Sequence, residues 1–163
     1  MRLPLNLTVY GRPQPAGSKR AFVNRSTGKV SVVDASKGSR PWKQEVTATA
    51  LEAWGPHAIA EQGPVVLDLR FFLARPKGHY RTGKNAHLLK ASAPEYPTGK
   101  PDTLKLTRAV EDALTGLAYK DDAQVVHQVA SKHYGSPERC EIRVRTVTSV
   151  TRERDDAQRT PTL

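Results

Sequence analysis

Five carboxylates are concentrated between residues 102 and 122 of a chain that is otherwise strongly basic. They are five of the sixteen acidic residues in the 163-residue sequence, namely Asp102, Glu111, Asp112, Asp121 and Asp122. Carboxylate oxygens are the ligands that Mg²⁺ prefers, and a divalent ion can activate water for attack on a phosphate. The segment is therefore a candidate metal site for work on a phosphate backbone.

A helix is expected between these acids. The apolar residues that recur at helical spacing are Leu106, Ala109, Val110, Ala113 and Leu114. Asp102 or Thr103 can cap the first turn, and Gly116 suits the left-handed residue after the last turn. A helix of about 12 residues spans ~18 Å. One metal can touch both Asp102 and Asp122 only if the connection folds back.

Each acidic feature also has an ordinary structural explanation. An Asp before a helix is usually only a cap, and an Asp-Asp pair is usually a solvated turn. Residues 124–129 have the β-branched content of a strand, whose start would bring Asp121 and Asp122 to the head of a sheet. An Asp before the helix and an Asp-Asp pair after it, taken together, indicate a metal site more specifically than either feature alone.

The segment resembles the RusA-type Holliday junction resolvases, small Mg²⁺-dependent endonucleases of bacteria and their phages. Asp102 matches the first Asp of their Asp-x-Asp-Asn signature, and residues 112–114 match the Asp-Ala-Leu that closes the helix. Residues 121–125 match the final Asp-Asp-Ala-Gln-Val motif, and Arg108 stands where the family has a Lys.

The resemblance implies a RusA-like fold and a structure-selective DNA endonuclease that resolves four-way junctions by paired symmetric nicks, in recombination and repair. It also implies an origin in a bacterium or one of its phages. It implies metal binding by Asp102 and the Asp121-Asp122 pair, with Asp122 the stronger candidate, and Mg²⁺ replaceable by Mn²⁺. Arg108 would be a cationic helper, so the catalytic set is Asp102, Asp122 and Arg108. A homodimer is expected, since two symmetric cuts need two sites.

The second Asp of the family signature is missing. Leu104 occupies its position and Lys105 replaces the Asn. Leucine cannot bind Mg²⁺, which leaves three alternatives. Glu111, seven residues later and ~10 Å along the same side of the helix, could supply the carboxylate. The site could use more water ligands, which Mg²⁺ tolerates. In the third alternative, the protein mainly binds junctions or other nucleic acid. We favour an active enzyme.

The overall charge favours a polyanion as partner. The net charge is +10 and the isoelectric point is about 10, which indicates nucleic acid first and an anionic membrane second. The sequence contains no amphipathic basic helix, so we expect DNA and no membrane as the partner. No apolar run approaches ~20 residues, and the first five residues are too short and too interrupted by Pro for a signal peptide. Cys140 is the only cysteine, so we expect no intrachain disulfide and a location in the cytoplasm, bacterial or that of a phage host.

Basic residues in Gly- and Pro-rich segments are candidates for binding the DNA backbone. Lys19 and Arg20 end one such segment, and a long basic loop at 75–100 leads directly to Asp102. Long loops in small domains are usually functional or disordered. The residues expected to contact DNA are Lys19, Arg20, Lys77, Arg81, Lys84 and Lys105. The alternative for each of these residues is that its side chain is exposed to solvent and does not contact DNA.

The remaining pattern predicts one domain over residues 1–147 and a flexible tail over 148–163. Strands are expected at 3–10, 64–73 and 138–147, with a hairpin of 21–23 and 29–33 and a helix over about 41–54. Residues 132–137 should form a turn, so the strand at 138–147 is expected to pair with the strand that precedes it. Trp42 and Trp54 fall on the apolar stripe of that helix and should pack in the core. The predicted class is α/β (α+β), with a mostly antiparallel or mixed sheet of about five strands and two main helices.

Overall fold

The computed structural model describes residues 5–17, 19–34, 38–55 and 63–147. For residues 19, 20, 22 and 31–34 it describes the backbone alone. The predicted tail at 148–163 lies outside the described residues.

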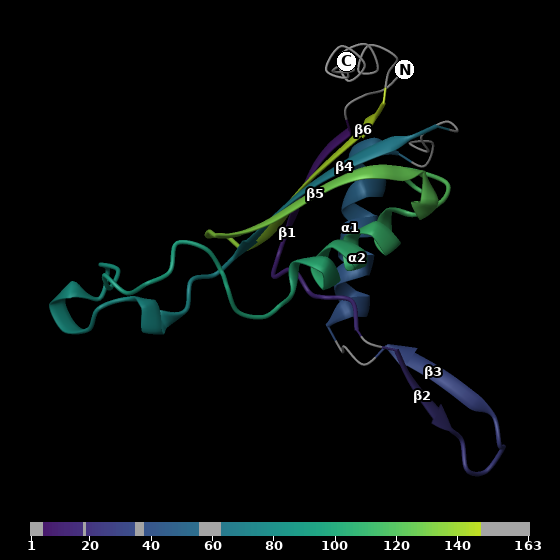
Figure 1. Cartoon of the computed structure of the whole chain (residues 1–163), viewed down its shortest axis with the longest axis horizontal. Coiled ribbons are helices and arrows are strands. Elements are labelled where there is room, and N and C mark those ends of the chain that lie inside the picture. The colour runs from purple at the N-terminus through teal and green to yellow at the C-terminus, as the bar shows by residue number, and fades with distance from the viewer. Residues whose placement is uncertain (1–4, 18, 35–37, 56–62, 148–163) are drawn as a thin grey trace, which may run out of the picture.

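Four strands form a mixed sheet in the order β1-β6-β4-β5. They are β1 (Leu5–Tyr10), β4 (Val65–Leu73), β5 (Val125–Tyr134) and β6 (Arg139–Thr146). β6 is antiparallel to both β1 and β4, whereas β5 is parallel to β4 and forms one edge (Figure 1). The predicted α+β class with a mixed sheet is confirmed.

Two details of the sheet differ from prediction. β5 continues to Tyr134, through residues that were expected to form a turn. β6 lies between β1 and β4 and does not pair with β5, the strand that precedes it in the chain. The alternation of Cys140, Ile142 and Val144, all buried, correctly indicates one buried face. Alternation says which face is buried but carries no information about the neighbouring strand.

Two helices cover one face of this sheet. α1 (Ser39–Trp54) and α2 (Thr103–Leu114) contact each other and share a core with β4 and β6 (Figure 1). Leu106, Val110 and Leu114 of α2 are fully buried, and each contributes about 1.5–3 kcal/mol by leaving water. Trp42 and Trp54 are also buried, as predicted. The apolar stripe therefore fixes which side of α2 faces solvent.

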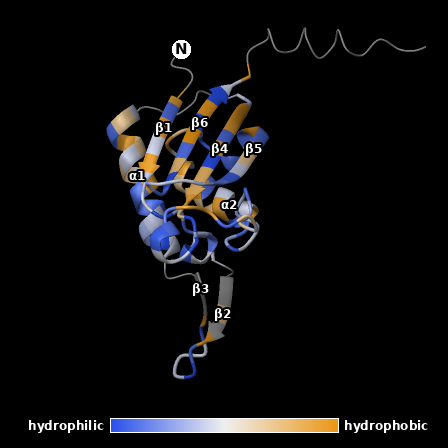
Figure 2. Cartoon of the chain, turned by 90° about the vertical axis from the view of Figure 1, so that its left-hand side faces the viewer, coloured by the Kyte–Doolittle hydropathy of each residue, from blue (hydrophilic) through white to orange (hydrophobic). Residues whose placement is uncertain are grey.

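Two segments project from this body. β2 (Lys19–Val23) and β3 (Val30–Asp34) form a separate two-stranded ribbon, so the expected sheet of about five strands is four strands and a ribbon (Figures 1 and 2). Residues 74–101 form an arm with two short 3₁₀ helices, Lys77–His79 and Gly83–Asn85. A bridge between Tyr80 and Leu89 closes the arm on itself, so it has local structure that the sequence did not predict.

Candidate active site at the two ends of helix α2

Asp102 occupies the N-cap position of α2 but does not cap it with its side chain. Its backbone is extended, and its carboxylate makes no capping hydrogen bond. The carboxylate instead lies 3.6 Å from the Lys105 ammonium, and more than half of the side chain is exposed. The predicted cap is therefore right in position, and the carboxylate remains accessible to a ligand.

Cations gather around this end of the helix. Arg12, Lys100 and Lys105 line a shallow hollow together with Asp102. On the neighbouring strand, the Lys132 ammonium donates to the carbonyl oxygens of Gly99 at 2.9 Å and Pro101 at 3.0 Å. The amino end of a helix also favours anions. This end of α2 therefore has the character of a phosphate-binding surface.

The other end of α2 is acidic. Burial raises the pKa of Glu111, and repulsion from Asp122 and Asp112 raises it further. The amide of Gln128 on β5 donates to Glu111 Oε1 at 3.2 Å, which partly offsets the rise in pKa. Asp112 is paired with the Lys43 ammonium, which lies 2.6 Å from its carboxylate. The raised pKa of Glu111 beside Asp122 therefore marks the place where negative charge is poorly compensated, and a cation would relieve it.

The turn that carries Asp122 is held by its neighbours. Asp121 Oδ1 accepts from the Ala123 amide at 2.9 Å, and Gln124 Oε1 accepts from the amides of Lys120 at 2.8 Å and Asp121 at 3.0 Å. This is a capping box around a 3₁₀ turn, Asp122–Gln124. Asp121 thus holds this turn in place. Asp122 is exposed, and its carboxylate has no hydrogen-bond or ion-pair partner among the described residues.

Tyr119 ties this turn to the helix. It is fully buried, and its hydroxyl donates to the Glu111 carbonyl at 2.9 Å. Burial and the nearby Glu111 and Asp122 carboxylates raise the pKa of the Tyr119 phenol, so it stays protonated as a donor. Tyr119 therefore holds Asp122 beside the acidic end of α2.

Within one chain, the helix separates the two groups of acids. Asp102 and Glu111 are nine residues apart, which is ~14 Å along the axis. β5 agrees with this spacing, because Gln128 reaches Glu111 and Lys132 reaches Pro101. Mg²⁺ binds oxygens at about 2.0–2.1 Å, so one ion cannot touch both ends. The described residues hold no group of three or more His, Cys, Asp or Glu that could bind an ion.

The residues of the expected metal set are thus brought together only in part. The structure places Glu111 and Asp122 near each other at the carboxyl end of α2 and Asp102 at its amino end. Asp121 accepts a hydrogen bond that holds its own turn. Leu104 is 76% exposed in the first turn of α2. Arg108 lies between the ends, exposed and close enough to Glu111 to lower its pKa slightly. Leu104, Arg108 and Glu111 share one exposed side at helical spacing.

The candidate DNA-binding residues fall on both projections and at the basic end of α2. Lys77, Arg81 and Lys84 are all exposed on the arm, where residues 75–100 contain six Lys or Arg and one acid. Lys19 and Arg20 begin β2, and only their backbone is described. Arg75 holds the base of the arm by donating to the Pro94 carbonyl at 2.7 Å and by lying 4.1 Å above the Tyr134 ring.

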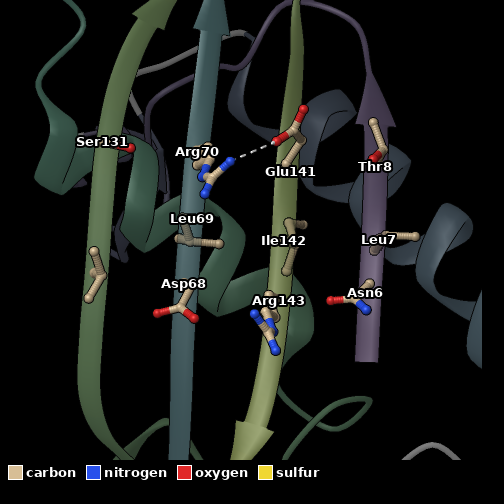
Figure 3. A pocket seen from close by; sticks show the side chains of 11 residues that line it. Asn6, Leu7, Thr8, Asp68, Leu69, Arg70, Ser131, Glu141, Ile142 and Arg143 are labelled. Atoms are coloured by element: carbon tan, nitrogen blue, oxygen red, sulfur yellow. Dashed lines mark ion pairs between the residues drawn. The ribbon is translucent and has the colours of Figure 1, made fainter. Parts of the chain in front are cut away.

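The open face of the sheet carries charges that neutralise one another. Figure 3 shows Asp68, Arg70, Glu141 and Arg143 side by side on this face. Arg70 lies 3.9 Å from Glu141, and Arg145 lies 3.0 Å from Asp68. Asp68 faces away from α2 because it alternates with the buried Leu67 and Leu69. The hollow on this face is therefore not a second group of uncompensated acids.

Four contributors to the site could not be located from the sequence. Gln128 and Lys132 act through contacts with residues at least 17 positions away, and Arg12 and Lys100 line the hollow beside Asp102. Spacing along the chain gives no signal for such contacts. The role of Asp121 in holding the turn could have been predicted from the sequence, because an Asp followed three residues later by Gln is a capping-box pattern.

A small mixed-sheet domain with an acidic helix end, a basic helix end and a basic arm is suited to the chemistry of nucleic acids. The model of the family "Endodeoxyribonuclease RusA" matches residues 13–145. The chain is also 34% identical over 145 residues to the uncharacterized protein YqaN of Bacillus subtilis (strain 168), across 89% of this chain and 98% of that protein. The chain belongs to the RusA endodeoxyribonuclease family.

Family membership confirms the resemblance seen in the motifs. It implies an endonuclease of the Holliday junction resolvase type, and nucleases of this family are typically Mg²⁺-dependent. It also implies binding to DNA junctions. Within the described part of the chain, no helix is both long and apolar enough to cross a membrane.

Proposed function

We propose that this protein is a Mg²⁺-dependent endonuclease that resolves four-way DNA junctions by paired symmetric nicks, in recombination and repair in the cytoplasm of a bacterium or phage host. The domain of residues 1–147 would carry the activity. The observation that carries the proposal is the opposite electrostatic character of the two ends of α2. Glu111 and Asp122 leave negative charge uncompensated at one end, while cations surround Asp102 at the other.

The proposal requires two chains for each site. In a twofold dimer with antiparallel α2 helices, the basic end of one helix lies against the acidic end of the other. Glu111 and Asp122 would then meet Asp102 of the partner subunit, and opposite charges would favour the contact. Twofold symmetry creates two such sites, one for each strand that is cut.

The residues present fit a magnesium ion. Mg²⁺ is commonly held by one or two carboxylates, with waters and substrate phosphate completing its shell. Asp122 and Glu111 of one chain would hold it together with Asp102 of the partner subunit. Asp121 uses one carboxylate oxygen to cap its own turn, so the other oxygen could also bind the ion. When bound, the ion would activate water and stabilise negative charge on the phosphate. Mn²⁺ is expected to substitute.

The cations of the chain would bind and orient the DNA. Arg108 projects from the same side of α2 as Glu111 and would place positive charge beside the scissile phosphate. Lys105 and its neighbours at the basic end would hold an adjacent phosphate. Lys19, Arg20 and the arm residues Lys77, Arg81 and Lys84 would contact the backbone further away, so affinity should fall steeply with salt.

Leu104 supports a second candidate function. It is an exposed leucine at the position where the family signature has a carboxylate, and a protein short of one metal ligand could bind nucleic-acid junctions without cutting them. A labelled four-way junction incubated with Mg²⁺ distinguishes the two functions. Symmetric nicks that disappear in Asp122→Asn support the endonuclease, and a gel shift without nicks supports the binding protein.

A further inference from the structure

The β2–β3 ribbon exposes apolar side chains at a place that nothing in the described chain covers. The two strands pair with each other in a sheet of their own and project from the body (Figures 1 and 2). Val23 and Val30 are directly opposite in the register and are 59% and 65% exposed. An isolated two-stranded hairpin is only marginally stable in water. The ribbon therefore has the properties of an element that is completed by a partner.

The tip of the ribbon is nevertheless well built. The Asn24 side-chain oxygen Oδ1 accepts from the Ser26 backbone amide at 2.9 Å, and its backbone carbonyl accepts from the Gly28 amide at 2.8 Å. The Asn24 backbone amide donates to the Lys29 carbonyl at 2.9 Å. Gly28 adopts a positive φ of 66°, which suits a turn and is costly for other residues. The tip is thus able to present side chains in a defined geometry.

The charge of the ribbon indicates what the partner is. Arg25 and Lys29 are exposed at the tip, and the ribbon from Lys19 to Asp34 contains four cations and one acid, Asp34, at the end far from the tip. A second copy of the ribbon would bring like charges together. A DNA duplex offers negative charge on both sides of a groove, and phosphate contacts generally position a protein on the duplex.

We propose that the β2–β3 ribbon enters the major groove of a duplex arm of the branched DNA. This inference rests on the proposed function. The major groove is about 12 Å wide and admits a two-stranded ribbon, whose strands lie about 4.8 Å apart. Arg25 and Lys29 contact phosphates on the groove walls, while Val23 and Val30 lie toward the base edges. The ribbon thereby sets the register of the active site on the arm.

The first test measures how DNA affinity depends on salt. Wild type and Arg25→Ala/Lys29→Ala are titrated with a four-way junction in EDTA, which prevents cutting. Each lost phosphate contact reduces the slope of log affinity against log salt by about 0.9, so the variant slope should fall by about 2, with at least a tenfold loss of affinity in low salt. The matched control, Arg70→Ala/Arg143→Ala, removes two cations from the open sheet face and should leave the slope unchanged. Thermal melts check that all three proteins fold.

The second test asks directly what the tip contacts. Cys140 is buried, so Thr27→Cys introduces the accessible thiol, which is labelled with a photo-crosslinker. Crosslinking to DNA is the expected result. Crosslinking to a second protein chain, or no crosslinking while the junction is bound, overturns the inference. An unchanged salt slope in the tip variant also overturns it and leaves the proposed function standing. If wild type does not bind the junction, both this inference and the proposed function are contradicted.

Discussion

The two ends of α2 contain the same kind of side chain in opposite surroundings. At the amino end, the Asp102 carboxylate lies beside the Lys105 ammonium, in a hollow that Arg12 and Lys100 also line. At the carboxyl end, Glu111 is partly buried and faces Asp122 and Asp112, and its pKa is raised. The amino end has an excess of positive charge, whereas at the carboxyl end Lys43 pairs with Asp112 and leaves Glu111 and Asp122 with an excess of negative charge.

This difference shows that a carboxylate cannot be assigned a role from its residue type alone. Cations near Asp102 suit the end that meets phosphate, and uncompensated acids suit the end that meets a metal. The helix keeps these two surfaces apart within a chain. A twofold partner with an antiparallel helix would unite them, which is why the proposed enzyme depends on its dimer.

The largest expected effects come from disabling each end separately. Asp122→Asn should lower cleavage by about 10²- to 10³-fold while junction binding in EDTA is retained. Lys100→Ala/Lys105→Ala should instead weaken junction binding. Cleavage gels and gel shifts on the same samples measure both quantities.

A matched control for the acidic end is Asp68→Asn, the same substitution on the open sheet face. It should retain full cleavage. Loss of cleavage in Asp68→Asn, or loss of binding in Asp122→Asn equal to that of the lysine variant, would contradict the division between the two ends.

An intermediate effect is expected from restoring an acid at the amino end. Leu104 is exposed in the first turn of α2, so Leu104→Asp removes no core packing, and the helix dipole favours a negative charge there. The variant should need a several-fold lower Mg²⁺ concentration for half-maximal cleavage. Leu104→Asn, of similar size without the charge, controls for shape. Equal Mg²⁺ requirements in both variants would argue that position 104 does not face the metal.

The smallest effect is a change in stability at the acidic end. The folded state raises the Glu111 pKa above its ordinary value of 4.5, so ionising this group destabilises the fold. The penalty is absent below that ordinary pKa, grows as the pH rises through the raised pKa and is complete above it. Glu111→Gln should therefore be more stable than wild type at pH 7 and gain nothing below the ordinary pKa.

Urea unfolding of wild type and Glu111→Gln, at pH 7 and at a pH below the ordinary Glu pKa of 4.5, measures this difference in the free energy of unfolding. Ca²⁺, which like Mg²⁺ takes carboxylate oxygens as ligands, should stabilise wild type more than Glu111→Gln, because binding to the folded state adds stability. A variant that is less stable than wild type at pH 7 would show that Glu111 is not held among uncompensated negative charges.

Local signals in the sequence predicted much of the fold and the family. The apolar stripe and Gly116 gave the limits of α2, and turn residues located the β2–β3 hairpin. Contacts between distant segments were not predictable in this way. Nothing in the alternation of β6 identifies β1 and β4 as its neighbours, and nothing near Glu111 in sequence indicates Gln128. The acids were found by type, and the length of the helix already indicated their separation. Whether the connection folds back to close that gap was not predictable, and β5, which lies along α2, shows that it does not.

The most direct measurement mixes two inactive chains. Asp102→Asn and Asp122→Asn chains are co-expressed and incubated with a labelled four-way junction and Mg²⁺. In a heterodimer with shared sites, one site carries both substitutions and the other carries neither. Random pairing should then restore about a quarter of the wild-type sites, seen as single unpaired nicks. If the mixture nicks no more than either variant alone, the shared-site account is contradicted.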